Sequence, residues 1–268
     1  MLARQRQAAI LDRVRATGGV RVTELAAEFG VSDMTIRRDL ETLHEQGLLA
    51  KVHGGATVPG PSSTDEPGFH AKSVRQLAEK AAIAGRAAEL VRPGAAVALS
   101  AGTTTAELAR RLVDVPGLTV VTNSLPVAEI LHAQGRTDQT VVLTGGVRTP
   151  SDALVGPLAV EAIRSLHLDL LFLGVHGITE RAGFTTPNLM EAETDRALVA
   201  AADRLVVLAD HTKWGTVGIS SIVGLGAADV LVTDDRLAPE ARRVLDEKVG
   251  ELVVVAGPGR ATTEGTAR

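Results

Sequence analysis

The chain has 268 residues, about 1.8 times the roughly 150 residues of a typical domain, so two domains are expected. Its composition, 45% hydrophobic and 22% charged, excludes a disordered or fibrous chain. The absence of cysteine excludes disulfides, thiol catalysis and cysteine-ligated metal sites. No apolar run approaches the roughly 18 residues of a membrane-spanning helix, and the basic start leads into no signal-peptide core. A cytoplasmic protein is therefore expected.

The net charge of −4 argues, taken alone, against a nucleic-acid binder. The charge is unevenly distributed, because residues 1–57 contain eight basic and seven acidic side chains, a net charge of +1. The remaining residues contain 20 basic and 25 acidic side chains, a net charge of −5. This difference is small, so the placement of the arginines decides whether the first part of the chain contacts DNA.

A stretch rich in proline and glycine, residues 57–68, separates two parts of different character. It contains three prolines and two glycines and has no apolar periodicity, which is typical of an exposed linker. We therefore predict a small domain over residues 3–58, a linker over 59–70, a second domain over 71–256 and a loose tail over 257–268.

Three helices are expected before the linker, over residues 5–17, 23–29 and 32–46. Thr23 and Ser32 are good N-cap residues for the second and third helices, and Gly30 ends the second. A short strand over residues 48–52 and a tight turn at 53–55 follow. A short helix, a three-residue turn and a second helix are the layout of a helix-turn-helix.

The third helix has an apolar face and a polar face. At about 100° per residue, Ile36, Leu40 and Leu43 share the face that points into the bundle. The helix start, the opposite side and its flanks present the candidate DNA contacts Ser32, Met34, Thr35, Arg37 and Arg38. Arginines there can pair with guanine edges or phosphates in the major groove, and Lys51 and His53 on the following strand and turn can reach phosphates. The alternative is a plain three-helix bundle whose arginines are only solvated.

Three stretches of this part have a distinctive spacing: Arg6-x3-Ile10-x3-Val14, residues 32–40 (SDMTIRRDL), and Leu48-x3-Val52 continuing into residues 53–56 (HGGA). Together they resemble the DeoR family of bacterial transcriptional regulators. The resemblance covers the whole amino-terminal segment with its spacing intact. It implies a winged helix-turn-helix in which the helix that starts at Ser32 is the recognition helix.

After the linker, short apolar segments alternate with helical patterns. The expected strands are residues 97–99, 119–121, 141–143, 170–173, 205–209, 230–232 and 252–255, and the expected helices are 105–112, 126–132, 158–166, 191–202 and 239–247. Strands that are apolar on both faces and alternate with helices predict a parallel sheet covered on two sides. The second domain is therefore expected to be a doubly wound α/β domain.

In such a sheet, ligands bind beyond the carboxyl ends of the strands. Gly102–Thr105 follow the first strand at a helix start, where backbone N–H groups and hydroxyls can hold an anion. Lys213 can supply a positive charge for a phosphate, and Asn123 and Asp210 can bond sugar hydroxyls. Two alternatives stay open, because Gly102–Thr105 can be just a well-capped helix start and Gly145–Gly146 just a tight turn.

Seven stretches of this second part have a recognisable sequence: Glu79-Lys80-x2-Ile83-Ala84, residues 101–105 (AGTTT), 118–126 (LTVVTNSLP), 145–146 (GG), 183–186 (GFTT) and 191–192 (EA), and Ala209-Asp210-x2-Lys213-Trp214-Gly215. They too are similar to the DeoR family. The resemblance implies an effector domain similar to ribose-5-phosphate isomerase and a sugar phosphate or related phosphorylated metabolite as inducer. The residues expected to bind it are Gly102, Thr103, Thr104, Thr105, Asn123, Gly145, Gly146, Glu191, Asp210 and Lys213. The chain departs from many members at Ser100 (acidic there), near Lys72 (arginine there) and at Asp195 (lysine there), and the reversed charge at Asp195 points to a different or less anionic effector.

The resemblance implies a homo-oligomeric regulator, a dimer or tetramer that binds double-stranded operator DNA, with repression as the family's usual mode. The alternative is a sugar-phosphate isomerase or hydrolase with an accessory DNA-binding domain. It would use Glu191 or Asp210 as general base and Lys213 as electrostatic partner. No cofactor or metal is expected, because Gly224-Leu225-Gly226 lacks the third glycine and the strand-turn-helix setting of a nucleotide fingerprint.

Overall fold

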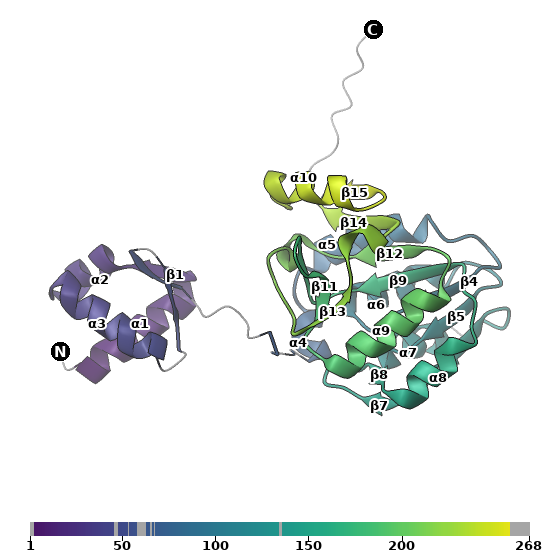
Figure 1. Cartoon of the computed structure of the whole chain (residues 1–268), viewed down its shortest axis with the longest axis horizontal. Helices are drawn as coiled ribbons and strands as arrows, with labels where there is room; N and C mark the ends of the chain where they lie inside the picture. Colours follow the sequence, from purple (N-terminus) through teal and green to yellow (C-terminus); the bar gives the residue numbers. More distant parts are fainter. Residues whose placement is uncertain are drawn as a thin grey trace, which may run out of the picture. The chain divides into compact units, whose positions relative to one another are not determined.

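The structure, a computed structural model, describes residues 3–45, 48–52, 54–57, 63–64, 66, 68–133 and 136–257. The chain divides into two compact units, Met1–Ser62 and Ser63–Arg268 (Figure 1). None of the helices in these described ranges is both long enough and apolar enough to cross a membrane.

The amino-terminal unit combines helices with a small antiparallel sheet. Its elements are α1 (Ala3–Thr17), β1 (Gly19–Arg21), α2 (Val22–Phe29), α3 (Asp33–Glu45), β2 (Ala50–Val52) and β3 (Gly55–Thr57). Strand β3 pairs with both β1 and β2, which gives the sheet order β1-β3-β2. Gly30 ends α2 in the left-handed conformation, with φ of 63°, and turns the chain toward α3. The expected winged helix-turn-helix is confirmed.

The start of α2 differs from the expectation. Helix α2 begins at Val22, directly after strand β1, and no side chain caps it. Thr23 therefore lies inside the first turn rather than at the N-cap. Val20 and Val22 are both buried in the core, so the chain passes from strand to helix without an intervening loop. Strand β1 itself was not expected, because three residues are too few for an alternating pattern to be visible.

The second unit is built on a sheet of seven parallel strands. They are β4 (Ala96–Leu99), β5 (Thr119–Thr122), β6 (Thr140–Leu143), β9 (Leu170–Gly174), β12 (Leu205–Leu208), β14 (Val230–Asp234) and β15 (Leu252–Val255). Their order is β15-β14-β12-β9-β4-β5-β6, and every neighbouring pair is parallel. The strand order runs outward in both directions from β4 and β9, as in a doubly wound sheet.

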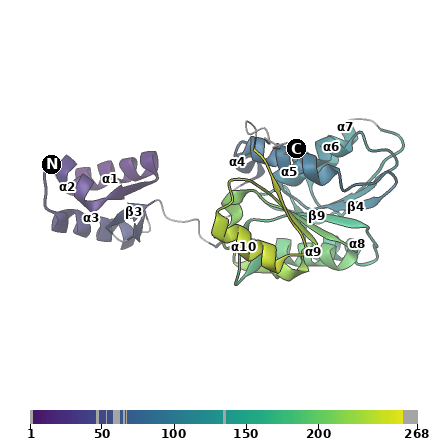
Figure 2. The same ribbon diagram turned by 90° about the horizontal axis from the view of Figure 1, so that it is seen from above.

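Helices cover both faces of this sheet. Figure 2 shows α5 (Leu77–Ala88), α6 (Thr103–Leu112) and α7 (Leu125–Ala133) on one face, and α8 (Pro157–Arg164), α9 (Leu189–Ala201) and α10 (Pro239–Lys248) on the other. Successive residues of a strand point to opposite faces, so Leu170 and Phe172 pack under the first set while Leu171 and Leu173 pack under the second. The predicted α/β fold is confirmed, and burial on both faces explains why its central strands are apolar throughout.

Helix α5 was not among the expected helices, and several short elements also lie outside the expected pattern. They are α4 (Phe69–Ser73), the strands β7 (Val147–Arg148), β8 (Leu154–Val155), β10 (Gly177–Thr179), β11 (Gly183–Thr186) and β13 (Ser220–Val223), and the 3-10 helices η1 (His211–Lys213) and η2 (Leu225–Ala227). Helix α4 starts inside the predicted linker, where the Phe69 N–H donates to the Pro150 carbonyl at 3.1 Å. β7 pairs with β8, and β10, β11 and β13 form a separate small sheet. Elements of two to five residues are too short to show a period.

Candidate functional site

Helix α3 presents the face predicted to contact DNA. Ile36, Leu40 and Leu43 are buried in the core of the amino-terminal unit, while Arg37 and Arg38 are exposed. The remaining candidates lie at the helix start: Met34 is 74% exposed, and the Ser32 hydroxyl accepts a hydrogen bond from the Thr35 N–H at 3.3 Å. Ser32 is exposed. Its hydrogen bond to the Thr35 N–H caps α3, as its N-cap position predicts.

A buried ion pair fixes the orientation of α3. Asp39 follows the two arginines but points inward, where its Oδ2 accepts from Arg6 Nε at 2.5 Å and its Oδ1 from Gln7 Nε2 at 3.0 Å. Both donors belong to α1, so the two helices are joined by charge-assisted hydrogen bonds away from water. Among the described residues neither Arg37 nor Arg38 makes an ion pair, so both guanidinium groups are available to a ligand.

The wing brings a further cation next to α3. Lys51 on β2 is exposed and pairs with Glu41 of α3, and this hydrogen bond holds the pKa of the Glu41 carboxyl below its usual range. Gly55 follows the turn into β3, and a Cβ atom there would lie 2.0 Å from the Val20 carbonyl oxygen. The wing therefore needs glycine at this position. His53, the other predicted phosphate contact of the wing, lies outside the described residues.

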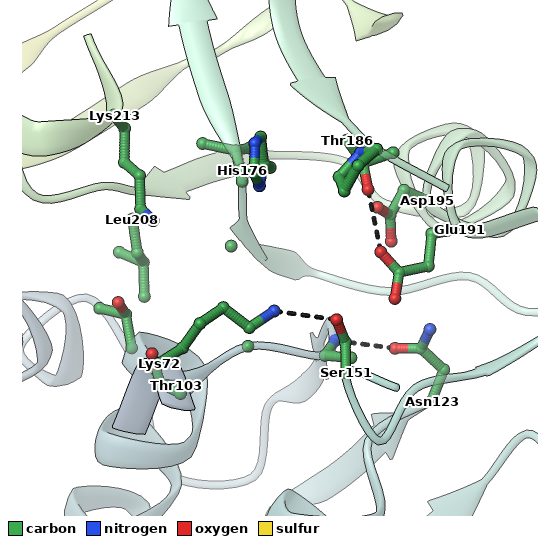
Figure 3. Close-up of a pocket in the computed structure, with 16 residues that line it drawn as sticks. Lys72, Thr103, Asn123, Ser151, His176, Thr186, Glu191, Asp195, Leu208 and Lys213 are labelled. Atoms are coloured by element: carbon green, nitrogen blue, oxygen red, sulfur yellow. Dashed lines mark hydrogen bonds between the residues drawn. The ribbon is translucent and has the colours of Figure 1, made fainter. Parts of the chain in front are cut away.

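A cavity lies at the carboxyl ends of the central strands in the second unit (Figure 3). Six of the ten residues expected to bind an effector line it: Gly102, Thr103, Thr104, Asn123, Glu191 and Lys213. The other lining residues are Lys72, Ala101, Ser151, Gly174, Val175, His176, Thr186, Pro187, Asp195 and Leu208. The cavity is therefore lined with hydroxyls, amides and charges of both signs.

The start of α6 forms one side of this cavity. Gly102 precedes the helix, and no side chain caps the first turn. The first N–H groups of a helix have no partner inside it, and the helix dipole adds partial positive charge there. The well-capped alternative does not hold, because the hydroxyl of Thr105 donates to the Gly102 carbonyl at 2.9 Å and accepts nothing from the helix start. This geometry suits an anion.

Two lysines stand beside the start of α6. Lys72, from α4, donates from Nζ to Ser151 Oγ at 2.8 Å, and its burial lowers its pKa while Glu191 opposes the shift. Lys213 extends into the cavity from η1 (Figure 3). Asp210 accepts a hydrogen bond from the Thr212 N–H at 3.0 Å and so caps the turn that carries Lys213.

Carboxylates of α9 lie across the cavity from these lysines. Glu191 accepts hydrogen bonds from the hydroxyls of Thr149 at 3.0 Å and Thr186 at 2.9 Å. Burial is the main cause that raises the pKa of Glu191, and burial followed by the charge of Glu191 raises that of Asp195. Asp195 and Glu191 are four residues apart and therefore on the same side of the helix.

Four predicted effector residues do not line the cavity. Thr105 is fully buried, and Asp210 is buried in its capping role. Gly145 and Gly146 turn the chain between β6 and β7 with φ values of 74° and 122°. A Cβ atom on Gly146 would lie 2.5 Å from the Val155 carbonyl oxygen, so this glycine permits close approach of backbone.

Some lining residues were not predicted as contacts. Ser151 lies in the turn between β7 and β8, and Thr186 ends the short strand β11, so neither belongs to a segment with a detectable period. Lys72 and Asp195 stood out in the sequence only as departures from the family pattern. Ser100, the third departure, is buried and accepts a hydrogen bond from the Gly174 N–H at 2.9 Å, which ties the end of β4 to the end of β9.

A winged helix-turn-helix joined to an α/β domain with a polar cavity is the architecture of a ligand-responsive transcriptional regulator. Residues 6–61 match the DeoR-like helix-turn-helix domain, and residues 75–235 match the DeoR C terminal sensor domain. The chain belongs to the DeoR family of transcriptional regulators.

Curated relatives and a solved structure extend this comparison. The chain is 33% identical to the putative aga operon transcriptional repressor of Escherichia coli, over 94% of each chain. It is 32% identical to the glycerol-3-phosphate regulon repressor of Escherichia coli, over 86% of this chain and 90% of that one. The ribose 5-phosphate isomerase A of Methanocaldococcus jannaschii is 17% identical with a TM-score of 0.37, over 50% of this chain and 53% of that one. Membership of this family makes the chain a transcriptional regulator rather than the isomerase or hydrolase of the alternative.

Proposed function

We propose that this regulator represses an operon for sugar catabolism and is released from its operator by a phosphorylated sugar or related metabolite. The names of the two relatives, repressors of the aga operon and of the glycerol-3-phosphate regulon, support this reading. A regulator that binds the chromosome acts in the cytoplasm.

The DNA contacts are assigned to α3 and the wing. Thr35, Arg37 and Arg38 meet base edges or phosphates in the major groove, with Ser32 and Met34 beside them. Lys51 and His53 reach phosphates from the wing. Two copies would place their recognition helices about one DNA turn apart, roughly 34 Å, on a repeated or palindromic site.

Self-association is supported by the edge of the large sheet. Strand β6 is an edge strand whose residues Val142 and Leu143 are exposed, as is Val147 on β7. An exposed apolar edge of this kind is a ready site for pairing with another chain. A homo-oligomer, a dimer or tetramer, is therefore part of the proposal.

One observation supports the effector assignment most strongly: the uncapped start of α6 and two lysines line the same cavity. A phosphate fits between the N–H groups at Thr103 and Thr104 and the ammonium groups of Lys72 and Lys213. The sugar then lies against Asn123 and Glu191. Asp210 acts through the turn that holds Lys213. The ligand must bind the DNA-incompetent state more tightly, since only differential affinity shifts a population.

The test is fluorescence anisotropy of labelled DNA from upstream of the protein's own gene, at fixed salt, with and without a panel of sugar phosphates. Tight binding that one sugar phosphate releases is the expected result. Arg38→Ala should weaken operator binding about five- to 150-fold, because a bidentate base contact is worth about 1–3 kcal/mol. Arg13→Ala, which removes an exposed arginine of α1, is the matched control. Equal effects of the two variants would refute the assignment of α3.

The cavity is tested separately with Lys213→Met. This variant should keep its operator affinity and lose release by the sugar phosphate, because its side chain lies in the cavity and not in the winged unit. Unchanged release would place the effector elsewhere.

A further inference from the structure

The cavity contains a carboxylate that the protein leaves without a hydrogen-bond donor. Asp195 lines the cavity from α9 and is only 7% exposed. Within the described ranges, no side chain or backbone N–H donates to its carboxylate. Its neighbour Glu191 differs, because hydroxyls of Thr149 and Thr186 donate to both of its oxygens. Burial of a carboxylate without donors is costly, so a ligand that supplies donors there gains affinity.

The charges of the cavity are arranged in two poles. Lys72, Lys213 and the start of α6 form a cationic pole, and Glu191 and Asp195 form an acidic pole on the other side (Figure 3). The ammonium of Lys72 is engaged with Ser151 at 2.8 Å rather than with Asp195. A single anion satisfies only the first pole. The lining therefore fits a ligand that carries opposite charges at its two ends.

Either a sugar hydroxyl or an ammonium group of the ligand could bind at the acidic pole, and the two differ in what they supply. A sugar hydroxyl donates one hydrogen bond and leaves the repulsion between Glu191 and Asp195 unchanged. A protonated amine donates up to three hydrogen bonds and also neutralises part of this repulsion. Hydrogen bonds between two charged groups are the stronger kind. An ammonium group therefore matches the pair of carboxylates better than a hydroxyl does.

We infer that the effector is a phosphorylated amino sugar, whose phosphate binds at the start of α6 and whose protonated amine binds Asp195. This inference rests on the proposed function for the phosphate and goes beyond it for the amine. It makes Asp195 the residue that selects amino sugars over ordinary sugars.

The experiment is calorimetric titration of the full chain with matched probes: glucose 6-phosphate, glucosamine 6-phosphate and N-acetylglucosamine 6-phosphate, each also in the galacto configuration. The three differ only in a hydroxyl, an ammonium or a neutral amide at one carbon. The ammonium probe of at least one configuration should bind about tenfold or more tightly than both partners. Asp195→Asn should reduce this preference to less than about threefold, while Glu193→Gln, an exposed acid of the same helix, should keep it.

The outcomes separate the inference from the proposed function. If the ammonium probe binds no more tightly than the hydroxyl probe or the amide probe, the inferred amine is refuted. The proposed sugar-phosphate function is then unaffected. Glucosamine without phosphate should bind at least tenfold more weakly than its 6-phosphate. If no phosphate probe binds at millimolar concentration, both proposals fail. The probe comparison uses the unmodified chain, so it does not depend on the folding of the Asp195 variant.

Discussion

Ser151 joins the linker to the cavity, because its hydroxyl accepts from Lys72 Nζ at 2.8 Å and donates to Glu66 Oε1 at 3.0 Å. Glu66 lies in the predicted linker, and its other oxygen accepts from Asn188 Nδ2 at 3.0 Å. Asn188 caps α9, the helix that carries Glu191. Glu66 is thus bonded to Ser151, which lines the cavity, and to the residue that caps the helix of Glu191. A phosphate that draws Lys72 away from Ser151 would remove one of the two hydrogen bonds of the Ser151 hydroxyl, the group that donates to Glu66.

Glu66→Gln is therefore expected to weaken communication between the effector and the DNA. The variant should bind the effector of the panel with little change, while the fold-change in operator affinity that this effector causes falls severalfold. Coupling free energies of this kind are typically about 1–3 kcal/mol and are reciprocal, so operator should also lose its effect on effector affinity. Anisotropy measures the effect of the effector on operator affinity, and calorimetry measures the effect of the operator on effector affinity. Glu89→Gln, which removes an exposed acid paired with Arg86, is the control, and equal behaviour of the two variants would contradict the link.

Lys80 should make the protein more stable as the pH rises above 8. Its ammonium donates to the carbonyls of Lys72 and Arg75, both at 2.6 Å, and burial lowers its pKa to about 8. An unfolded lysine keeps its proton up to about pH 10.4, so the unfolded state binds more protons between these values. The free energy of unfolding therefore rises with pH across this window.

Denaturant unfolding at a series of pH values measures this rise. Lys80→Met should show a smaller rise than the unmodified chain between pH 8 and 10. The slope should not vanish, because the pKa of Lys72 is lowered in the same direction. Tyrosine and cysteine, which would also titrate in this range, do not occur in the chain. Identical slopes for the variant and the unmodified chain would show that Lys80 is not responsible.

The parts predicted from sequence are those with a period. Ile36, Leu40 and Leu43 recur at helical spacing and form the buried face of α3. The alternating faces of Leu170 and Phe172 against Leu171 and Leu173 follow from a strand buried on both sides. Such patterns are visible because each residue repeats the environment of the residue two, three or four positions away.

The parts that were missed depend on contacts between distant segments. Lys72 and Ser151 are 79 residues apart and come from a five-residue helix and a turn, so no local pattern announces their contact. Asp210 shows a second limit. Its position after a strand places it at the correct edge of the sheet, but the direction of its side chain depends on the turn that it caps. The position of a residue relative to a strand predicts the edge of the sheet at which it lies, but it does not predict what its side chain contacts.

Trp214 should report ligand binding. It is the only tryptophan, the chain has no tyrosine, and it directly follows Lys213. Trp214 is partly buried against the core, and its backbone bridges to Ile178. A ligand that moves the ammonium of Lys213 should change the emission of this indole, whereas sodium chloride at the same ionic strength should not. A flat response to a ligand that binds by calorimetry would place that ligand away from Lys213.

Gly55→Ala should disrupt the wing. The added Cβ atom would lie 2.0 Å from the Val20 carbonyl, so β1 and β3 must separate at a cost of about 1–3 kcal/mol. Operator affinity should fall together with the stability of the amino-terminal unit, as measured by anisotropy and by thermal unfolding. Gly85→Ala is the contrasting change inside α5, where a Cβ atom meets nothing within 4 Å. It should stabilise the second unit by about 0.5–1 kcal/mol.

Glu41 limits the contribution of Lys51 to DNA binding. The two side chains are paired in the free protein, so a DNA phosphate must compete with the Glu41 carboxylate for the same ammonium. Glu41→Gln should therefore raise the affinity for DNA of unrelated sequence severalfold. Anisotropy at several salt concentrations measures this affinity, because each neutralised phosphate contributes about 0.9 to the slope of log K against log salt.

The role of this pair is separated from general charge by two further variants. Glu45→Gln removes an exposed acid of the same helix that does not pair with Lys51, and it should raise affinity less than Glu41→Gln. When Lys51 is replaced by Met, Glu41→Gln should raise the DNA affinity no more than Glu45→Gln does. The comparison with and without Lys51 is a double-mutant cycle, which isolates the contribution of the Glu41–Lys51 pair. Equal gains from the two glutamates would mean that net charge, and not release of Lys51, governs the effect. A larger gain that persists without Lys51 would assign it to repulsion between Glu41 and the DNA itself.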